Sequence, residues 1–294
     1  MEALYLHIAN KLEAIRYGRP PAGSKIINLA ELKSLEFWRA VFAEFLAQIF
    51  FVFLGGASAI DITGSGGDQL KIAFAFGLAI MALIQMIGHV SGGHINPAVS
   101  IAMAVAMNIT ILRAVFYVIA QVVGAIIGGY ILKGLTPDGH HADLAVTGLG
   151  KDVTQAQGFG VELLLTFVLV TVIFGTTDSN RPGFGSPALL IGLTVTLGHV
   201  AGIQYTGSSM NPSRSLGSAV ASDSWDDHWI YWVGPIAGGV LSAIVYKLVL
   251  NPYRGVINMD EAVEKMNGDS SFVAIPKSYF KGDSNSVKPE TTHM

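Results

Sequence analysis

Two short apolar stretches that each begin with an Asn-Pro pair constrain this chain more than any other feature. Residues 96–98 read Asn-Pro-Ala and lead into the run 99–107, while residues 211–213 read Asn-Pro-Ser and begin the run 213–221. Asparagine caps free backbone N–H groups, and proline fits the first helical position. Each run is shorter than the ~20 residues that cross a bilayer. Short, interrupted apolar segments at matching places predict a permeation or binding site inside a membrane.

The composition supports a membrane location. Hydrophobic residues make up 51% of the chain and charged residues 13%, with a mean hydropathy of +0.50. Soluble domains carry about 25% charged residues. The net charge of -3 comes without a basic patch, so we expect no nucleic-acid partner. The chain contains no cysteine, which excludes disulfides and thiol chemistry.

Six further apolar segments are long enough to span a bilayer. We expect the spans at residues 37–59, 70–90, 111–132, 158–176, 186–203 and 229–250. Polar segments flank them at residues 1–35 and 253–294. The predicted fold class is therefore an all-α membrane protein with six transmembrane helices and two re-entrant half-helices.

The two halves of the chain repeat one pattern. Each half contains a span with a glutamate, a second span, an Asn-Pro half-helix and a third span. Glu44 precedes Asn96 by 52 residues, and Glu162 precedes Asn211 by 49. Three spans per half is an odd number, so the second half is expected to be inverted relative to the first. Such a 3+3 inverted repeat places its site near the membrane midplane.

Basic residues predict the orientation of the chain. The connection 61–68 carries no basic residue. The head and the start of the first span carry six: Lys11, Arg16, Arg19, Lys25, Lys33 and Arg39. Because positive loops stay on the cytoplasmic side, both termini are expected there. We expect an integral protein of the plasma membrane, with the lipid bilayer as its surroundings.

The asparagines of the two motifs allow two interpretations. In one, Asn96 and Asn211 only cap their half-helices. In the other, the side-chain oxygen caps the helix and the amide N–H groups face a passing oxygen atom. Such an oxygen would point its own hydrogens outward, which would interrupt a continuous chain of hydrogen bonds.

Four stretches carry a resemblance to a known family. They are Phe-Trp-Arg-Ala at 37–40, His-Ile-Asn-Pro-Ala-Val at 94–99, Asn-Pro-Ser-Arg-Ser at 211–215 and Trp-Ile-Tyr-Trp-Val-Gly-Pro at 229–235. They resemble the aquaporin, or major intrinsic protein, family. The resemblance covers residues 36–252, which are therefore the expected channel domain. It implies a homotetramer with one pore per subunit and water as the permeant.

Residue roles follow from the resemblance by position. Pro97, Ala98, Pro212 and Ser213 complete the two signature motifs, although the family usually has alanine where Ser213 stands. Four residues are expected to form the outer selectivity filter: Phe76, His199, Ser208 and Arg214. His94 is expected to line the cytoplasmic mouth. Without the resemblance, Phe76 would be interpreted as a packed ring and His199 as a buried histidine. A charge inside a short apolar segment is costly, so Arg214 must line water or find a partner, with a structural ion pair as the alternative.

The intramembrane carboxylates, Glu44 and Glu162, also have two interpretations. A carboxylate inside a membrane is costly and usually functional. We expect both to accept hydrogen bonds from the irregular backbone before each half-helix, which must be satisfied in lipid. Proton coupling is the alternative. No metal site or cofactor is predicted.

The permeant is expected to be water. Glycerol facilitators of the family typically have aspartate directly after the filter arginine and a smaller residue in place of the filter histidine. Here these positions hold Ser215 and His199. The alternatives are a glycerol or small neutral solute facilitator, an aquaporin-fold scaffold with little flow, and an ion- or proton-coupled transporter. An enzyme is not expected, because the spans contain no cluster of nucleophile, base and orienting group.

Overall fold

The computed structural model describes residues 27–64, 67–140, 144–178 and 185–250. All of these lie in one compact unit, residues 19–251. The second unit consists of residues 1–18 and 252–294, which lie outside the described residues. The predicted C-terminal tail and most of the predicted N-terminal segment fall there as well.

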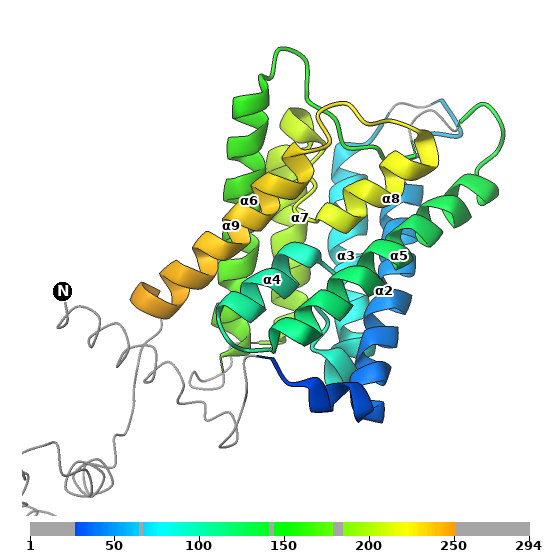
Figure 1. Cartoon of the computed structure of the whole chain (residues 1–294). Coiled ribbons are helices and arrows are strands. Elements are labelled where there is room, and N and C mark those ends of the chain that lie inside the picture. Colours follow the sequence, from blue (N-terminus) through cyan, green and yellow to red (C-terminus); the bar gives the residue numbers. More distant parts are fainter. Residues whose placement is uncertain (1–26, 65–66, 141–143, 179–184, 251–294) are drawn as a thin grey trace, which may run out of the picture. The chain divides into compact units, whose positions relative to one another are not determined.

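The described residues form helices and no strands (Figure 1). Six helices are long and apolar enough to span a membrane: α2 (Leu35–Ala59), α3 (Gln69–Ser91), α5 (Ile111–Leu135), α6 (Gln155–Thr177), α7 (Pro187–Thr206) and α9 (Ile230–Val245), which a π-helical turn, η2 (Tyr246–Leu250), prolongs. Two helices are short: α4 (Pro97–Val105) and α8 (Pro212–Ser222). The predicted class, six long helices and two half-helices, is confirmed.

Several helix ends differ from the predicted ones for local reasons. Helix α6 begins three residues early because Thr154 and Gln157 form a capping box, in which each side chain bonds the backbone of the other. Helix α7 continues past residue 203 to Thr206 and is capped by Gly207, whose φ of +72° suits glycine. A short 3-10 helix, η1 (Leu29–Lys33), precedes α2 within the polar head.

The long helices pack in pairs, two of which lie within a half while the third crosses between the halves. Helix α2 lies against α5, α6 against α9, and α3 against α7. Each half-helix contacts a long helix of the opposite half, α4 against α9 and α8 against α5. Figure 1 shows α4 and α8 between the long helices. The half-helices therefore interlock the two repeats.

Small residues allow the closest of these contacts. A Cβ atom on Gly77 of α3 would overlap the backbone carbonyl of Gly192 on α7, and the reverse is also true. A Cβ atom on Gly217 of α8 would overlap the carbonyl of Ala125 on α5. Helices in membranes use such small residues to approach closely. Gly77 and Gly192 are 115 residues apart, the same spacing as Asn96 and Asn211.

The outer surface of the helices is apolar while several polar side chains are buried inside. Large exposed apolar side chains occur on most of the long helices, among them Phe42, Phe50, Leu78, Ile119, Leu164, Leu197, Val200 and Leu241. This distribution suits a protein whose solvent is lipid. The buried polar residues gather around the half-helices.

Candidate functional site

The two asparagines cap the half-helices in similar ways. Asn96 and Asn211 both have extended backbone angles, and each is followed by proline. Oδ1 of Asn96 accepts the N–H of Ala98 at 2.9 Å, and Oδ1 of Asn211 accepts the N–H of Arg214 at 3.2 Å. The side-chain oxygens are therefore committed to the helix starts, so the Nδ2 atoms are available for other contacts.

The backbone before each asparagine is irregular and is held by a glutamate. Glu44 of α2 accepts the N–H of His94 with Oε1 at 2.9 Å and the N–H of Ile95 with Oε2 at 2.6 Å. Glu162 of α6 accepts the N–H groups of Ser209 and Met210, both at 2.8 Å. Both carboxylates are fully buried. Each therefore satisfies two backbone donors that lipid could not satisfy.

Each glutamate also accepts a hydroxyl from the end of a long helix. Oε1 of Glu44 accepts from Ser91 at 2.6 Å, and Oε1 of Glu162 accepts from Thr206 at 2.7 Å. Ser91 and Thr206 are again 115 residues apart. Glu44 has one further donor, Nε2 of Gln121 at 2.9 Å. The hydrogen bonds thus repeat the sequence pattern from one half to the other.

The two half-helix starts are tied to each other by crossed hydrogen bonds. Nδ2 of Asn96 donates to the carbonyl of Met210, and Nδ2 of Asn211 donates to the carbonyl of Ile95, both at 2.8 Å. Ile95 and Met210 both have φ of 52°, a conformation that costs a non-glycine residue about 1–3 kcal/mol. The contacts to the glutamates and asparagines hold these strained residues in place.

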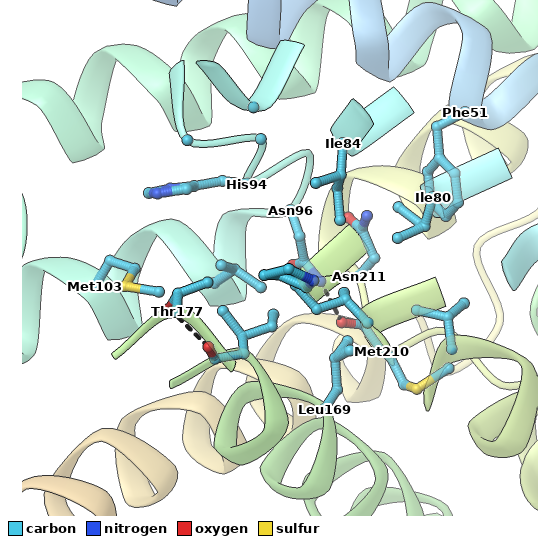
Figure 2. Close-up of a pocket in the computed structure, with 18 of the residues that line it drawn as sticks. Phe51, Ile80, Ile84, His94, Asn96, Met103, Leu169, Thr177, Met210 and Asn211 are labelled. Carbon is cyan, nitrogen blue, oxygen red and sulfur yellow. Dashed lines mark hydrogen bonds between the residues drawn. The ribbon is translucent and has the colours of Figure 1, made fainter. Parts of the chain in front are cut away.

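A cavity of about 390 Å³ runs past both asparagines. Figure 2 shows Asn96 and Asn211 close together on one side of it, with Ile80, Ile84 and Leu169 nearby. Its wall is mostly apolar and comes from α2, α3, α4, α6 and α7, with a polar strip supplied by the loops. A molecule passing through would find hydrogen-bonding groups on that strip.

His94 lines this cavity (Figure 2). Its Nδ1 lies 3.0 Å from Oγ of Ser100, and its ring meets Tyr117 edge to face with centroids 5.2 Å apart. The hydroxyl of Tyr117 donates to the carbonyl of Ser91 at 2.9 Å. The imidazole is therefore fixed by its neighbours rather than free to swing across the cavity.

The four predicted filter residues come from three helices and one loop. Phe76 of α3 and His199 of α7 stack with centroids 4.5 Å apart, and the Arg214 guanidinium lies 4.7 Å from the Phe76 ring centroid. Oγ of Ser208 donates to the carbonyl of Gly198, the residue before His199, at 3.0 Å. The structure thus brings together residues that are up to 138 positions apart in the chain.

The polar atoms of the filter are arranged as donors and one acceptor. Nδ1 of His199 lies 2.9 Å from the carbonyl of Val195, so this nitrogen carries the proton and Nε2 is an acceptor. Nη1 of Arg214 donates to the carbonyl of Ala145 and to the hydroxyl of Ser218. Both partners are neutral, so neither of these hydrogen bonds pairs the guanidinium with a carboxylate. Nε2 of His199 and Nε of Arg214 have no protein partner among the described residues.

Several residues of the site were not singled out from the sequence. Gln121, Ser91 and Thr206 support the glutamates, and Ala145 places the arginine. Gln121 is an amide inside an apolar span, which is a signal that sequence reasoning could have used. A backbone carbonyl such as that of Ala145 leaves no signal in the sequence.

Comparison with known proteins agrees with this geometry. Residues 31–246 match the family model described as major intrinsic protein. The chain is 50% identical over 223 residues to aquaporin-2 of Homo sapiens, covering 76% of this chain and 82% of that protein. It is 51% identical over 240 residues to aquaporin-5 of Sus scrofa, covering 81% of this chain and 90% of that protein.

A solved structure agrees as well. The X-ray structure of the aquaglyceroporin from Plasmodium falciparum superposes with a TM-score of 0.68 at 29% identity, covering 74% of this chain and 98% of that one. The family match extends from η1 to the end of α9. The chain therefore belongs to the major intrinsic protein family, the family of the aquaporins.

Proposed function

We propose that this protein is a water-selective channel, which passes water down osmotic gradients and excludes protons and ions. The observation that carries the proposal is the pair of crossed hydrogen bonds between the half-helix starts. They hold the Nδ2 atoms of Asn96 and Asn211 at one level of the cavity wall. The orientation of a water molecule is fixed when its oxygen accepts hydrogen bonds from two donors at the same place in the pore, as these two amides would allow.

The second N–H of each amide is the group that would meet the permeant. An asparagine amide carries two N–H donors, and each Asn96 and Asn211 amide uses one on a backbone carbonyl. A water oxygen that accepts the other two must point its hydrogens along the pore in opposite directions. Its neighbours on both sides then accept from it, so no continuous chain of donors crosses this point and proton hopping is interrupted.

Electrostatics would add a barrier to cations. The N-terminal ends of α4 and α8 meet at the asparagines, and each carries partial positive charge. At the filter, Arg214 adds a full positive charge whose nearest partners are neutral. Cations would meet repulsion at both places, while neutral water would meet hydrogen-bond donors.

Passage of glycerol is the second candidate function, because one solved structure with this fold is named an aquaglyceroporin. The filter favours water. The rings of Phe76 and His199 stack with centroids 4.5 Å apart, and their bulk would narrow the level at which glycerol has to pass. Pore diameter is a main determinant of which solutes pass.

The proposal includes assembly and placement. The family resemblance supports a homotetramer with one pore per subunit, residues 36–252 as the channel domain, and a plasma-membrane location. The excess of basic residues before α2 supports a cytoplasmic N-terminus. Six spans then return the C-terminus to the same side.

Osmotic swelling of vesicles containing the purified protein tests the function. In a stopped-flow experiment, we expect faster water movement than in empty vesicles and glycerol movement at the rate of empty vesicles. A scaffold would give no acceleration of water. A coupled transporter would instead accumulate its solute against a gradient when a proton or ion gradient is imposed, and a facilitator would pass glycerol.

A further inference from the structure

The second signature motif carries a hydroxyl where the first carries a methyl group. Ser213 is the second residue after Asn211, as Ala98 is the second residue after Asn96. Both are fully buried, and neither lines the cavity. Any effect of Ser213 on the permeant therefore has to pass through a neighbouring residue that lines the cavity, such as Asn211. This inference rests on the proposed function and adds a positioning residue to it.

The hydroxyl of Ser213 changes how the asparagine oxygen is held. Oγ of Ser213 donates to Oδ1 of Asn211 at 2.8 Å, which is shorter than the 3.2 Å contact from the N–H of Arg214. In the first motif, Oδ1 of Asn96 accepts from the N–H of Ala98 at 2.9 Å. A carbonyl oxygen has two lone pairs. In Asn211, two donors use both of them.

The orientation of the Asn211 amide is fixed by its backbone contacts. A half-turn of the amide would set its NH₂ group against the N–H of Arg214 and its oxygen against the carbonyl of Ile95. These two contacts would become repulsive, whereas the Ser213 hydroxyl could turn and accept from the NH₂ group. A half-turn of the Asn96 amide would spoil two contacts, one to Ala98 and one to Met210.

Two donors on an amide oxygen also affect the other end of that amide. Hydrogen bonds polarise one another along a chain, so acceptance at oxygen strengthens donation from nitrogen. We propose that Ser213 is a positioning residue, whose hydroxyl is the second donor to the Asn211 amide oxygen and thereby makes Nδ2 of Asn211 a stronger donor to permeating water than Nδ2 of Asn96. The two asparagines thus have the same role and unequal strength.

The test uses four forms of the full-length protein in lipid vesicles: unmodified, Ser213→Ala, Ser213→Thr and Ala98→Ser. Solid-state NMR reads the side-chain ¹⁵N signals of the two asparagines, which are identified by correlation with ¹³C-labelled Ile95 and Met210. Ser213→Ala removes the hydroxyl and Ser213→Thr keeps it. Ala98→Ser is the matched control, because it gives the first motif the hydroxyl of the second.

The expected spectra follow from the hydrogen bonds. In the unmodified protein, Nδ2 of Asn211 resonates downfield of Nδ2 of Asn96. Ser213→Ala moves the Asn211 signal to the Asn96 position, Ser213→Thr leaves it in place, and Ala98→Ser moves the Asn96 signal downfield. An Asn211 signal that does not move in Ser213→Ala overturns the proposal, as does an equal shift in Ser213→Thr. If Ser213→Thr fails to fold, the Ala98→Ser signal decides: no downfield shift overturns the proposal.

Water permeability of the same variants tests whether the change in the Asn211 amide affects function. Unit water permeability is expected to fall about two- to twelvefold in Ser213→Ala, the range that one neutral hydrogen bond spans in an equilibrium, and to recover in Ser213→Thr. Equal permeability of the Ser213→Ala and unmodified proteins would overturn the positioning role. Failure of the proposed function looks different, since the unmodified protein would then show no water flux while the NMR comparison would still stand.

Discussion

Glu44 and Glu162 lie on different long helices and make the same three hydrogen bonds. Each accepts one hydroxyl and two successive backbone N–H groups from the loop that leads to a half-helix. Because these loops run inside the protein at membrane depth, no water is available to replace the carboxylates. These hydrogen bonds support a structural role for both carboxylates, which does not require proton coupling.

Replacing either carboxylate by an amide should therefore destabilise the protein. In Glu44→Gln or Glu162→Gln, an NH₂ group takes the place of one acceptor oxygen and leaves a buried donor unsatisfied, which costs about 1–3 kcal/mol. Thermal unfolding of the purified protein should show a lower midpoint for both variants. Glu36→Gln, at an exposed position in the first turn of α2, is the control and should unfold like the unmodified protein. Unchanged midpoints in the first two variants would refute the structural role.

Widening the filter should admit glycerol. The double change Phe76→Ala with His199→Gly removes both stacked rings and leaves Arg214 in place. Glycerol flux into vesicles should rise above background, because the narrowest level of the pore loses its bulk. Phe74→Ala removes an exposed ring from the same helix and should leave glycerol excluded. If the double variant folds and passes water but not glycerol, the filter lies elsewhere.

The local patterns of the sequence predicted the helices better than the contacts between them. The span predicted at 111–132 begins at Ile111 in the structure, and both half-helices begin with their Asn-Pro pairs. Apolar run length and capping residues are local signals, which explains this agreement. The crossed bonds from Asn96 and Asn211 join residues more than 110 positions apart and depend on how the two repeats interlock, which no local pattern encodes.

In the site, too, local signals could be read from the sequence and contacts between distant residues could not. The carboxylates stood out in the sequence because charge is rare in a membrane span. Gln121, which bonds Glu44 and Ser100, is less conspicuous. The bond from Ser213 to Asn211 depends on the rotamer of a small side chain, which the fold rather than the sequence pattern determines.

The channel should resist mercurials. Members of the family commonly carry a filter cysteine at the position of Ser208, and this chain contains no cysteine at all. A hydroxyl does not form the thiolate that binds soft metals. Water permeability should be unchanged by mercuric chloride and should become sensitive in Ser208→Cys, while Ser186→Cys, at an exposed position before α7, should stay resistant. Inhibition of the unmodified protein that a reducing agent reverses would contradict this.

Protein stability should fall in mild acid partly through His228, which lies between α8 and α9. Burial lowers the pKa of His228 below its ordinary value of 6.5. Its Nε2 accepts a hydrogen bond from Nε1 of Trp232 at 3.1 Å, which requires the neutral ring. Because the pKa of His228 is lower in the folded protein, the folded protein binds fewer protons at this residue than the unfolded protein does. Its contribution to stability is therefore complete above about pH 6.5 and is lost as the pH falls through the folded pKa.

The measurement is the thermal midpoint between pH 8 and pH 5. The midpoint of the unmodified protein should decline below about pH 6.5, and His228→Gln should decline less steeply. Trp232→Phe removes the donor to the ring and should weaken the preference for neutral His228. Parallel pH curves for the unmodified and His228→Gln proteins would show that this histidine does not contribute.

Water flux and proton flux, measured in the same reconstituted vesicles, test the central claim most directly. An osmotic step reports water movement by light scattering, and a dye trapped inside reports proton movement under an imposed pH gradient. The facing amides of Asn96 and Asn211 and the charge of Arg214 predict rapid water movement with a proton leak equal to that of empty vesicles. A proton current that rises in proportion to the water flux as more protein is reconstituted would contradict the account.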